Sequence, residues 1–354
     1  MKKIAFVSLS NLYAVPYIKK YIRAMNGEVS YDIIMWNRHG VSEDDYGAEK
    51  VFSYTALMNE SLPKPVKFLH MIKFCNYAGK ILKLEDYDGV IILHTNAGIL
   101  LHHILCTKYS KKFILDIRDY SMEYNKLYYW IEHKLMKHST YCFISSDGFR
   151  TFLPEHEYYL VHNNIYLSPE EIEAFRNRPR QEGVIRITFI GMVRFFEEGK
   201  RLAASIGNDS RFTVGYYGKN GLKMRKFIGE VPNHLYTDQF APERTMEYYM
   251  KTDAINNVYG NNVYVNYLLS NKLYYSTMLG IPILVSPNTY MAQVVQEYQV
   301  GFVYDLDDPL ARDHFYTYYR SIDWDEFDAN CRRFCEKVAR DDEVFEQKVR
   351  EFFY

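Results

Sequence analysis

Residues 270–285 read SNKLYYSTMLGIPILV and join a predicted helix to a predicted strand. Lys272 lies at the start of the helix, and the turn at 280–282, Gly-Ile-Pro, leads into the apolar residues 283–285. The start of a helix offers free backbone N–H groups and a partial positive charge, to which the lysine adds a full charge. The stretch is therefore predicted to hold a phosphate group.

Short apolar runs alternate with amphipathic stretches on both sides of this motif, which is the pattern of βα units around a parallel sheet. The first half has predicted strands at 4–9, 32–36, 90–93, 113–117, 141–144 and 159–161, with helices at 13–25, 66–84, 97–109 and 123–137. The second half has strands at 185–191, 212–217, 253–258, 283–285 and 302–304, with helices at 201–206, 221–229, 242–251, 264–279 and 290–297, and it is helical from 309 onward. The pattern indicates an α/β protein with two doubly wound domains.

The domain boundary is predicted at 168–183, a polar segment flanked by prolines that has the composition of an exposed linker. A chain of 354 residues with 48% hydrophobic residues is long enough for two cores. We therefore expect one Rossmann-like domain at 1–167 and a second at 184–339.

Charge, cysteine content and the length of the apolar runs argue against several classes of protein. The formal net charge of −1 argues against nucleic-acid binding, which needs a strongly basic face. The five cysteines form no Cys-x-x-Cys pair, which argues against a zinc site and favours a reduced, cytoplasmic setting. The apolar run at 4–9 is too short for a signal peptide. The most apolar helix candidate, at 97–106, is shorter than the roughly 20 residues that a membrane span needs.

Two further groups of residues in the second half suit a phosphate-containing ligand. The strand ending at Gly191 is followed by Arg194 and Lys200, which combines a glycine that permits close approach with two cations. The strand at 253–258 breaks into a turn rich in asparagine and glycine, where parallel strands usually face their ligand. Solvated surface charges and ordinary turn chemistry are the alternative interpretations.

Residues 270–282 resemble the nucleotide-sugar signature of GT-B glycosyltransferases. The closest pattern is that of family 4 (group 1) enzymes of bacterial capsule and exopolysaccharide synthesis, Pro-x-Lys-x-x-Glu-x-x-x-x-Gly-x-Pro. Tyr275 stands where these enzymes carry the glutamate, and Tyr267 stands at a second glutamate position eight residues earlier. A phenol cannot clamp two ribose hydroxyls as a carboxylate does, so ribose recognition needs another residue or the activity is lost.

The resemblance implies a GT-B fold with two Rossmann-like domains facing across a cleft and a last helix, 340–354, that returns to the first domain. It also implies a donor site in the second domain. The residues assigned to that site are Gly191, Arg194, Lys200, Asn257, Tyr259, Asn261, Asn271, Lys272 and Tyr275.

In the first domain, the strand at 113–117 is followed by Arg118 and Asp119. Their position resembles the cleft-facing motif of some family 4 enzymes, which implies that Arg118 contacts an anion and Asp119 orients a hydroxyl. A helix cap with a salt bridge is the alternative. His94 and Asn11 follow two other predicted strands and are assigned to the acceptor side, although a structural role for the histidine stays open.

The predicted helix at 64–83 carries five lysines, one histidine and no acid, with apolar residues between them. A basic amphipathic helix binds an anionic bilayer. Alternatively, its apolar face packs on the sheet while the lysines extend into water. The resemblance implies a polyprenyl-linked or oligosaccharide acceptor, and with it a contact at the inner face of the cell membrane.

Together these features predict a retaining glycosyltransferase that moves a sugar from a nucleoside-diphosphate sugar to a glycan. No cofactor and no divalent metal is expected, because the pairs Asp305/Asp307 and Asp323/Asp325 precede helices, where aspartates act as caps. Two alternatives remain open: a non-catalytic GT-B partner of another transferase, and a nucleotide-sugar 2-epimerase.

Overall fold

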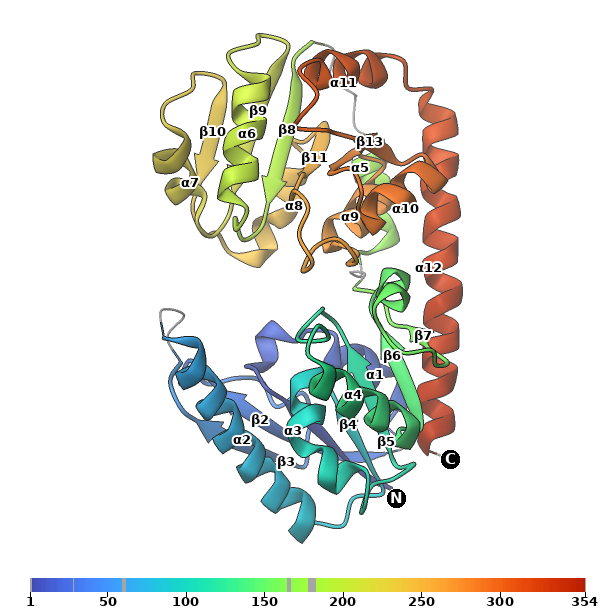
Figure 1. Ribbon diagram of the computed structural model, residues 1–354. Helices are drawn as coiled ribbons and strands as arrows, with labels where there is room; N and C mark the ends of the chain where they lie inside the picture. Colours follow the sequence, from blue (N-terminus) through green and yellow to red (C-terminus); the bar gives the residue numbers. More distant parts are fainter. Residues whose placement is uncertain (1, 28, 59–61, 164–166, 178–182, 354) are drawn as a thin grey trace. The chain divides into compact units, whose positions relative to one another are not determined.

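The computed structural model describes residues 2–27, 29–58, 62–163, 167–177 and 183–353. The chain divides into two compact units (Figure 1). Unit 1 comprises Met1–His162 and Arg340–Tyr354, and unit 2 comprises Asn163–Ala339. Each unit is a parallel sheet covered by helices, so the predicted α/β class with two doubly wound sheets is confirmed.

Unit 1 contains a seven-stranded sheet in the order β3-β2-β1-β4-β5-β6-β7. Its strands are β1 (Lys3–Ser8), β2 (Ser30–Asn37), β3 (Lys50–Thr55), β4 (Gly89–Ile92), β5 (Phe113–Ile117), β6 (Tyr141–Ile144) and β7 (Tyr159–Leu160). The chain runs from β1 to one edge and then resumes on the other side of β1 with β4. The strand order therefore reverses between β1 and β4.

Helices cover both faces of this sheet. Helix α1 (Ile18–Met25) and the end of α12 (Trp324–Phe353) pack on one face, where Tyr21 and Phe345 meet with ring centroids 4.9 Å apart. On the other face α2 (Lys64–Leu84), α3 (Thr95–Leu105) and α4 (Lys126–His138) lie side by side (Figure 1). The short helices η1 (Leu12–Ala14) and η2 (Asp147–Thr151) follow β1 and β6.

Unit 2 repeats this plan with six strands in the order β10-β9-β8-β11-β12-β13. The strands are β8 (Ile185–Ile190), β9 (Phe212–Tyr217), β10 (His234–Thr237), β11 (Ala254–Asn257), β12 (Ile283–Val285) and β13 (Gly301–Val303). The helices are α5 (Pro169–Arg176), α6 (Phe196–Ile206), α7 (Gly221–Ile228), η3 (Pro242–Arg244), α8 (Thr245–Tyr249), α9 (Asn271–Leu279), α10 (Tyr290–Tyr298) and α11 (Ala311–Arg320). Here the strand order reverses between β8 and β11.

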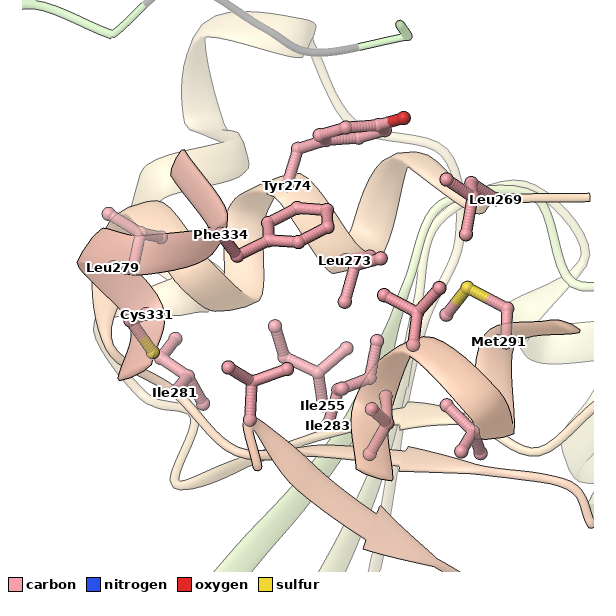
Figure 2. Packing of buried hydrophobic residues seen from close by; sticks show 14 of the residues in the cluster. Ile255, Leu269, Leu273, Tyr274, Leu279, Ile281, Ile283, Met291, Cys331 and Phe334 are labelled. Atoms are coloured by element: carbon pink, nitrogen blue, oxygen red, sulfur yellow. The ribbon is translucent and has the colours of Figure 1, made fainter. Parts of the chain in front are cut away.

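The apolar side of α9 fixes this helix against the unit 2 sheet. Leu273 lies over Ile255 of β11 and Ile283 of β12, and Phe334 of α12 closes the same cluster (Figure 2). All four side chains are at most 2% exposed. The packing thus fixes the position of α9 relative to β11 and β12.

Helix α12 is a single run of 30 residues. Its first half buries Phe327 and Phe334 in the core of unit 2, whereas Phe345 and Val349 are buried in the core of unit 1. These apolar residues recur in the sequence at the period of an α-helix, which is why the segment was predicted to be helical. Residues 340–353 thus belong to unit 1, as the resemblance implied for the last helix.

Several expected boundaries were wrong, and the reasons are local. The helix expected at 264–279 begins only at Asn271, because Ser270 caps it. The helix expected at 13–25 is divided into η1 and α1, with Pro16, which lacks an N–H group, between them. The edge strands β3 and β10 were not predicted. The linker predicted at 168–183, whose sequence allowed one or two helical turns, contains α5 at 169–176, and its role as the domain boundary stays a prediction; 178–182 lie outside the described residues.

Among the described residues, no helix combines the length and the apolar character needed to cross a bilayer.

Candidate functional site

The site in unit 2 lies at the carboxyl ends of β8 and β11, where the strand order reverses. Gly191 follows β8, and the turn at 258–262 follows β11. In open α/β sheets the two chain segments diverge at this point and leave a crevice, which is where ligands bind. The first turn of α9 supplies the remaining group, Lys272.

Lys272 is the central residue of this site. Its Nζ donates a hydrogen bond to Tyr259 Oη at 2.8 Å and lies 4.0 Å from the ring centroid of Phe189. The residue is only 8% exposed, and no ion pair is found for it in the described ranges. Aromatic rings and a phenol stabilise an ammonium group in part, but a buried charge without a counterion is costly. The arrangement is thus suited to an anionic ligand.

The backbone around Lys272 permits close approach. Gly191 has a φ of +123°, and a β-carbon built on it would lie 3.9 Å from Lys272 Nζ. The hydroxyl of Ser270 accepts a hydrogen bond from the backbone N–H of Lys272 at 3.3 Å and so begins the helix there. The ring of Tyr259 is fixed by stacking on Phe195, with centroids 4.1 Å apart. Gly191, Tyr259 and Lys272 are therefore brought together.

Asn257 ends β11 in the same region. It is 3% exposed, and its Oδ1 has no hydrogen-bond partner among the described residues. It lines a pocket of about 10 Å³, enough for one water molecule, together with Tyr259 and Ser286, whose hydroxyl accepts from Gly260 N at 2.8 Å. The amide oxygen is thus enclosed, and the pocket beside it has room for one hydrogen-bonding group of the size of water.

The other donor-site predictions are less well supported by the geometry. Arg194 is exposed, and within the described ranges its one polar contact is the donation from Nε to Met192 Sδ at 3.1 Å. Lys200 lies over Phe227 of α7 at 5.4 Å, and within the described ranges no contact joins it to Lys272. Asn261 and Asn271 are exposed. Their roles stay predictions.

Tyr275, at the expected glutamate position, faces the core. Its ring stacks on Tyr249 of α8 with centroids 4.4 Å apart, and burial, followed by the charge of Glu171, raises the pKa of its phenol. Tyr267 is half-buried in the segment before α9. Neither position offers the carboxylate that the family pattern has.

In unit 1, His94 lies at the reversal between β1 and β4. Its Nδ1 accepts the backbone N–H of Leu9 at 3.3 Å, which leaves the proton on Nε2. Burial, and then the charges of Arg38 and Arg118, lower the pKa of the imidazole to about 3. At neutral pH, His94 is therefore a neutral hydrogen-bond donor.

Arg118 forms the salt bridge that was the alternative interpretation of its motif. Its guanidinium donates to Asp116 Oδ2 at 2.8 Å and to Val161 O at 3.2 Å, and it covers the ring of Tyr17 at 3.7 Å. Asp119 is exposed. The predicted anion contact of Arg118 would compete with Asp116, so both catalytic assignments stay predictions.

Asn11 is completely buried and fully hydrogen-bonded. Its Nδ2 donates to Asn37 Oδ1 at 2.9 Å and to Glu43 Oε2 at 3.1 Å, while its Oδ1 accepts the backbone N–H of Arg38 at 2.9 Å. All the polar groups of the amide are thus used within the protein. The residue fixes the loop after β1 against the end of β2.

Replacing Asn11 by alanine should lower the free energy of unfolding by about 2 kcal/mol, because buried partners lose their hydrogen bonds. Urea unfolding followed by circular dichroism measures the change. Asn76→Ala, at an exposed position of α2, is the matched control and should be neutral or slightly stabilising. Equal effects of the two substitutions would contradict the structural role of Asn11.

Helix α2 combines both interpretations of its sequence. Phe74 and Leu82 are buried on the sheet, whereas Val66, Phe68 and Leu69 in the first turns are 38–50% exposed. Its lysines at 64, 73, 80 and 83 are exposed as well. The start of the helix therefore presents apolar and basic side chains together.

Within the described residues, no group of three or more His, Cys, Asp and Glu side chains is placed to hold a metal ion. Asp323 Oδ1 accepts the backbone N–H of Asp325 at 3.1 Å before α12, and Asp305 Oδ1 accepts that of Asp307 at 2.9 Å. Both aspartate pairs thus make local turn contacts of the kind expected for caps.

Sequence reasoning missed the aromatic surroundings of Lys272. Phe189 and Phe195 form them, and they come from β8 and the turn after it. Arg38 was also missed, although a cation directly after an apolar strand is a signal that could have identified it.

No protein-family model and no curated protein matches the chain. Its structure is similar to sucrose-phosphate synthase from Thermosynechococcus elongatus, with a TM-score of 0.69, 12% identity and coverage of 100% of this chain and 99% of that one. Anabaena Alr3699/HepE in complex with UDP and glucose has a TM-score of 0.67 at 10% identity, and the lipopolysaccharide outer core galactosyltransferase WaaB has 0.63 at 13%, each with 99% of both chains covered. These likenesses over the whole chain establish that it has the GT-B fold that residues 270–282 led us to expect.

Proposed function

We propose that the protein transfers a sugar from a nucleoside-diphosphate sugar to a glycan acceptor, with retention at the anomeric carbon. The observation that carries the proposal is Lys272 at the first turn of α9, a buried cation for which the described residues supply no counterion. The similarity in fold to a protein solved with UDP and glucose agrees with such a donor.

In this proposal the departing diphosphate lies between Gly191 and the start of α9. Negative charge grows on the diphosphate as its bond to the sugar breaks, and Lys272 and the free N–H groups of the helix stabilise that charge. Because these groups are fixed before the reaction, they need little reorganisation. The ammonium supplies the positive charge, so the proposed reaction is independent of a divalent metal.

The nucleoside needs other contacts, because Tyr267 and Tyr275 replace the glutamates of the family pattern. We assign a hydroxyl of the sugar or the ribose to Asn257, whose buried Oδ1 lacks a partner in the described part of the chain. Arg194 is exposed just after Gly191 and has no acid partner among the described residues, so it is free to reach a phosphate.

For the acceptor we propose a lipid-linked glycan used in cell-surface polysaccharide synthesis. The exposed Val66, Phe68 and Leu69, together with the lysines of α2, provide an apolar and basic surface. Such a surface suits contact with the anionic inner face of the cell membrane.

Binding of nucleotides tests the donor site directly. The ligands to screen are uridine, guanosine and cytidine diphosphates and the corresponding nucleoside-diphosphate sugars. Those that carry one of the three bases should raise the Tm of the protein, since a ligand that binds only the folded state stabilises it. Lys272→Met should weaken that binding by about tenfold or more through loss of a charge-assisted contact. Lys226→Met, at an exposed position of α7, is the control and should bind as the wild type does.

A non-catalytic role is the second candidate, and the two tyrosines at the glutamate positions favour it. No shift of Tm with any nucleotide would support that role and contradict the proposed transfer. Conversion of a bound nucleotide sugar to its epimer without acceptor, detected by chromatography, would instead indicate an epimerase.

A further inference from the structure

Arg38 lies directly after β2, at the carboxyl edge of the unit 1 sheet. Its side chain is half-buried, with the guanidinium carbon 4.5 Å from the ring centroid of Trp36. Its Nε is enclosed and has no hydrogen-bond partner in the described ranges, and no ion pair of Arg38 is found there. Among the described residues, only the aromatic ring of Trp36 compensates the charge of Arg38.

Other enclosed cations of unit 1 have acids beside them. Arg118 pairs with Asp116 at 2.6 Å, and Lys20 pairs with Asp342 at 2.7 Å. For Arg38, burial lowers the pKa to about 10, and no acid in the described part of the chain counteracts this effect. Because guanidinium offers five N–H donors in a fork that matches an oxyanion, these unused donors indicate a ligand and not a structural partner.

The loop after β1 connects Arg38 with His94. Asn11 Oδ1 accepts the backbone N–H of Arg38, and Leu9 N donates to His94 Nδ1. The charge of Arg38 also acts on the His94 imidazole, whose Nε2–H is left free to donate. Arg38 follows β2 and His94 follows β4, so one positive and one neutral donor stand on either side of β1 at the carboxyl edge of the sheet, beside the strand reversal where open α/β sheets bind ligands.

We propose that Arg38 and His94 bind an oxyanion, a phosphate or a carboxylate, carried by the acceptor. This inference rests on the proposed transfer for the identity of the ligand. The acceptor would then be an acidic sugar or a sugar attached through a phosphate. Arg38 supplies a bidentate contact and His94 a single hydrogen bond, and Asn11 positions the arginine through its backbone.

Chemical protection tests the site in the full-length protein. Phenylglyoxal attacks the neutral form of arginine, so Arg38 should react readily, and peptide mass mapping gives the rate at each arginine separately. At a ligand concentration of about ten times Kd, methyl phosphate or glucuronate should slow the modification of Arg38 by about tenfold. Glucose, which lacks a charge, should have no effect. The exposed Arg350 of α12 serves as the reference.

Methyl phosphate and glucuronate distinguish the two possible sources of the oxyanion, a phosphate link and an acidic sugar. Protection by methyl phosphate alone indicates a phosphate-linked acceptor, and protection by glucuronate alone indicates an acidic sugar. Absence of protection by both, with the reference arginine unchanged, overturns the inference. The same peptide map gives the modification rate at Arg194. If a nucleoside diphosphate protects Arg194 but neither methyl phosphate nor glucuronate protects Arg38, the acceptor-anion site is refuted and the donor site stands.

Arg38→Met provides an independent readout. If the arginine serves a ligand, its removal should keep or raise Tm and should abolish the stabilisation that methyl phosphate or glucuronate gives. Arg38→Lys should restore that stabilisation only in part, since lysine has no fork. A fall in Tm with Arg38→Met, together with unchanged stabilisation by both anions, would mark the residue as structural.

Discussion

Sugar transfer by the Lys272→Met variant should be at least about 10²-fold slower than by the wild type, while unit 2 stays folded. Methionine keeps the length of the side chain and its contacts with the rings of Phe189 and Tyr259. It removes the charge that stabilises the departing diphosphate, together with the hydrogen bond from Lys272 Nζ to Tyr259 Oη. Stability should not fall, because the variant also removes a buried charge that has no counterion in the described part of the chain.

Release of nucleoside diphosphate, with the donor that the binding screen identifies, measures this effect. Lys226→Met, exposed on α7, controls for general loss of lysine and should retain the wild-type rate. Lys272→Arg should keep part of the activity, since the charge remains but its position changes. Wild-type turnover in Lys272→Met would refute the assigned role even if nucleotides bind.

Replacing Glu132 of α4 by glutamine should stabilise the protein by about 3 kcal/mol at neutral pH. Glu132 is 0% exposed, and neither carboxyl oxygen has a hydrogen-bond partner among the described residues. Burial, and then the charge of Glu123, raise the pKa of this carboxyl to about 9 from 4.5. The folded protein therefore holds a proton on Glu132 at neutral pH.

The direction of the pH dependence follows from that proton. Between pH 4.5 and about 9 the folded state keeps the proton that the unfolded chain has lost. The free energy of unfolding thus falls as the pH rises, by about 1.4 kcal/mol per pH unit from this group. The contribution is fully present below pH 4.5 and is lost progressively toward pH 9. Glutamine does not titrate in this range, so the free energy of unfolding of the variant should not fall with pH through this position.

Urea unfolding near pH 5 and near pH 8 measures the effect, with a difference between variant and wild type that grows with pH. Glu155→Gln, at an exposed position of unit 1, is the control and should add no pH-dependent difference. Parallel pH profiles for the wild type and Glu132→Gln would show that Glu132 is ionised in the folded protein.

The sequence predicted those features that depend on local chemistry. The period of the apolar runs identified the central strands, because strands buried on both faces are almost continuously apolar. The edge strand β3 was missed because its residues alternate between exposed and half-buried positions. The start of α9 was placed too early, since Tyr264 and Leu268 continue the apolar spacing and only the cap at Ser270 ends it.

Those residues of the unit 2 site could be predicted whose positions depend on where a strand ends and on the spacing within a motif. Gly191, Tyr259 and Lys272 come together because β8, β11 and α9 meet at one edge of the sheet. The contact of Lys200 with Phe227 depends instead on how α6 packs against α7, which no local pattern reveals. The pairing of Arg118 with Asp116 was foreseeable, because residues two apart on a strand share a face.

The state of the thiols has a practical consequence for spectroscopy. None of the five cysteines, all of which lie in the described ranges, forms a disulfide, and burial raises the pKa of Cys75 and Cys142 to about 12. Since the thiolate is the form that reacts, these two sulfurs should resist maleimides and mild oxidants. A fluorophore attached to one introduced surface cysteine would then report on nucleotide binding with little background from these positions.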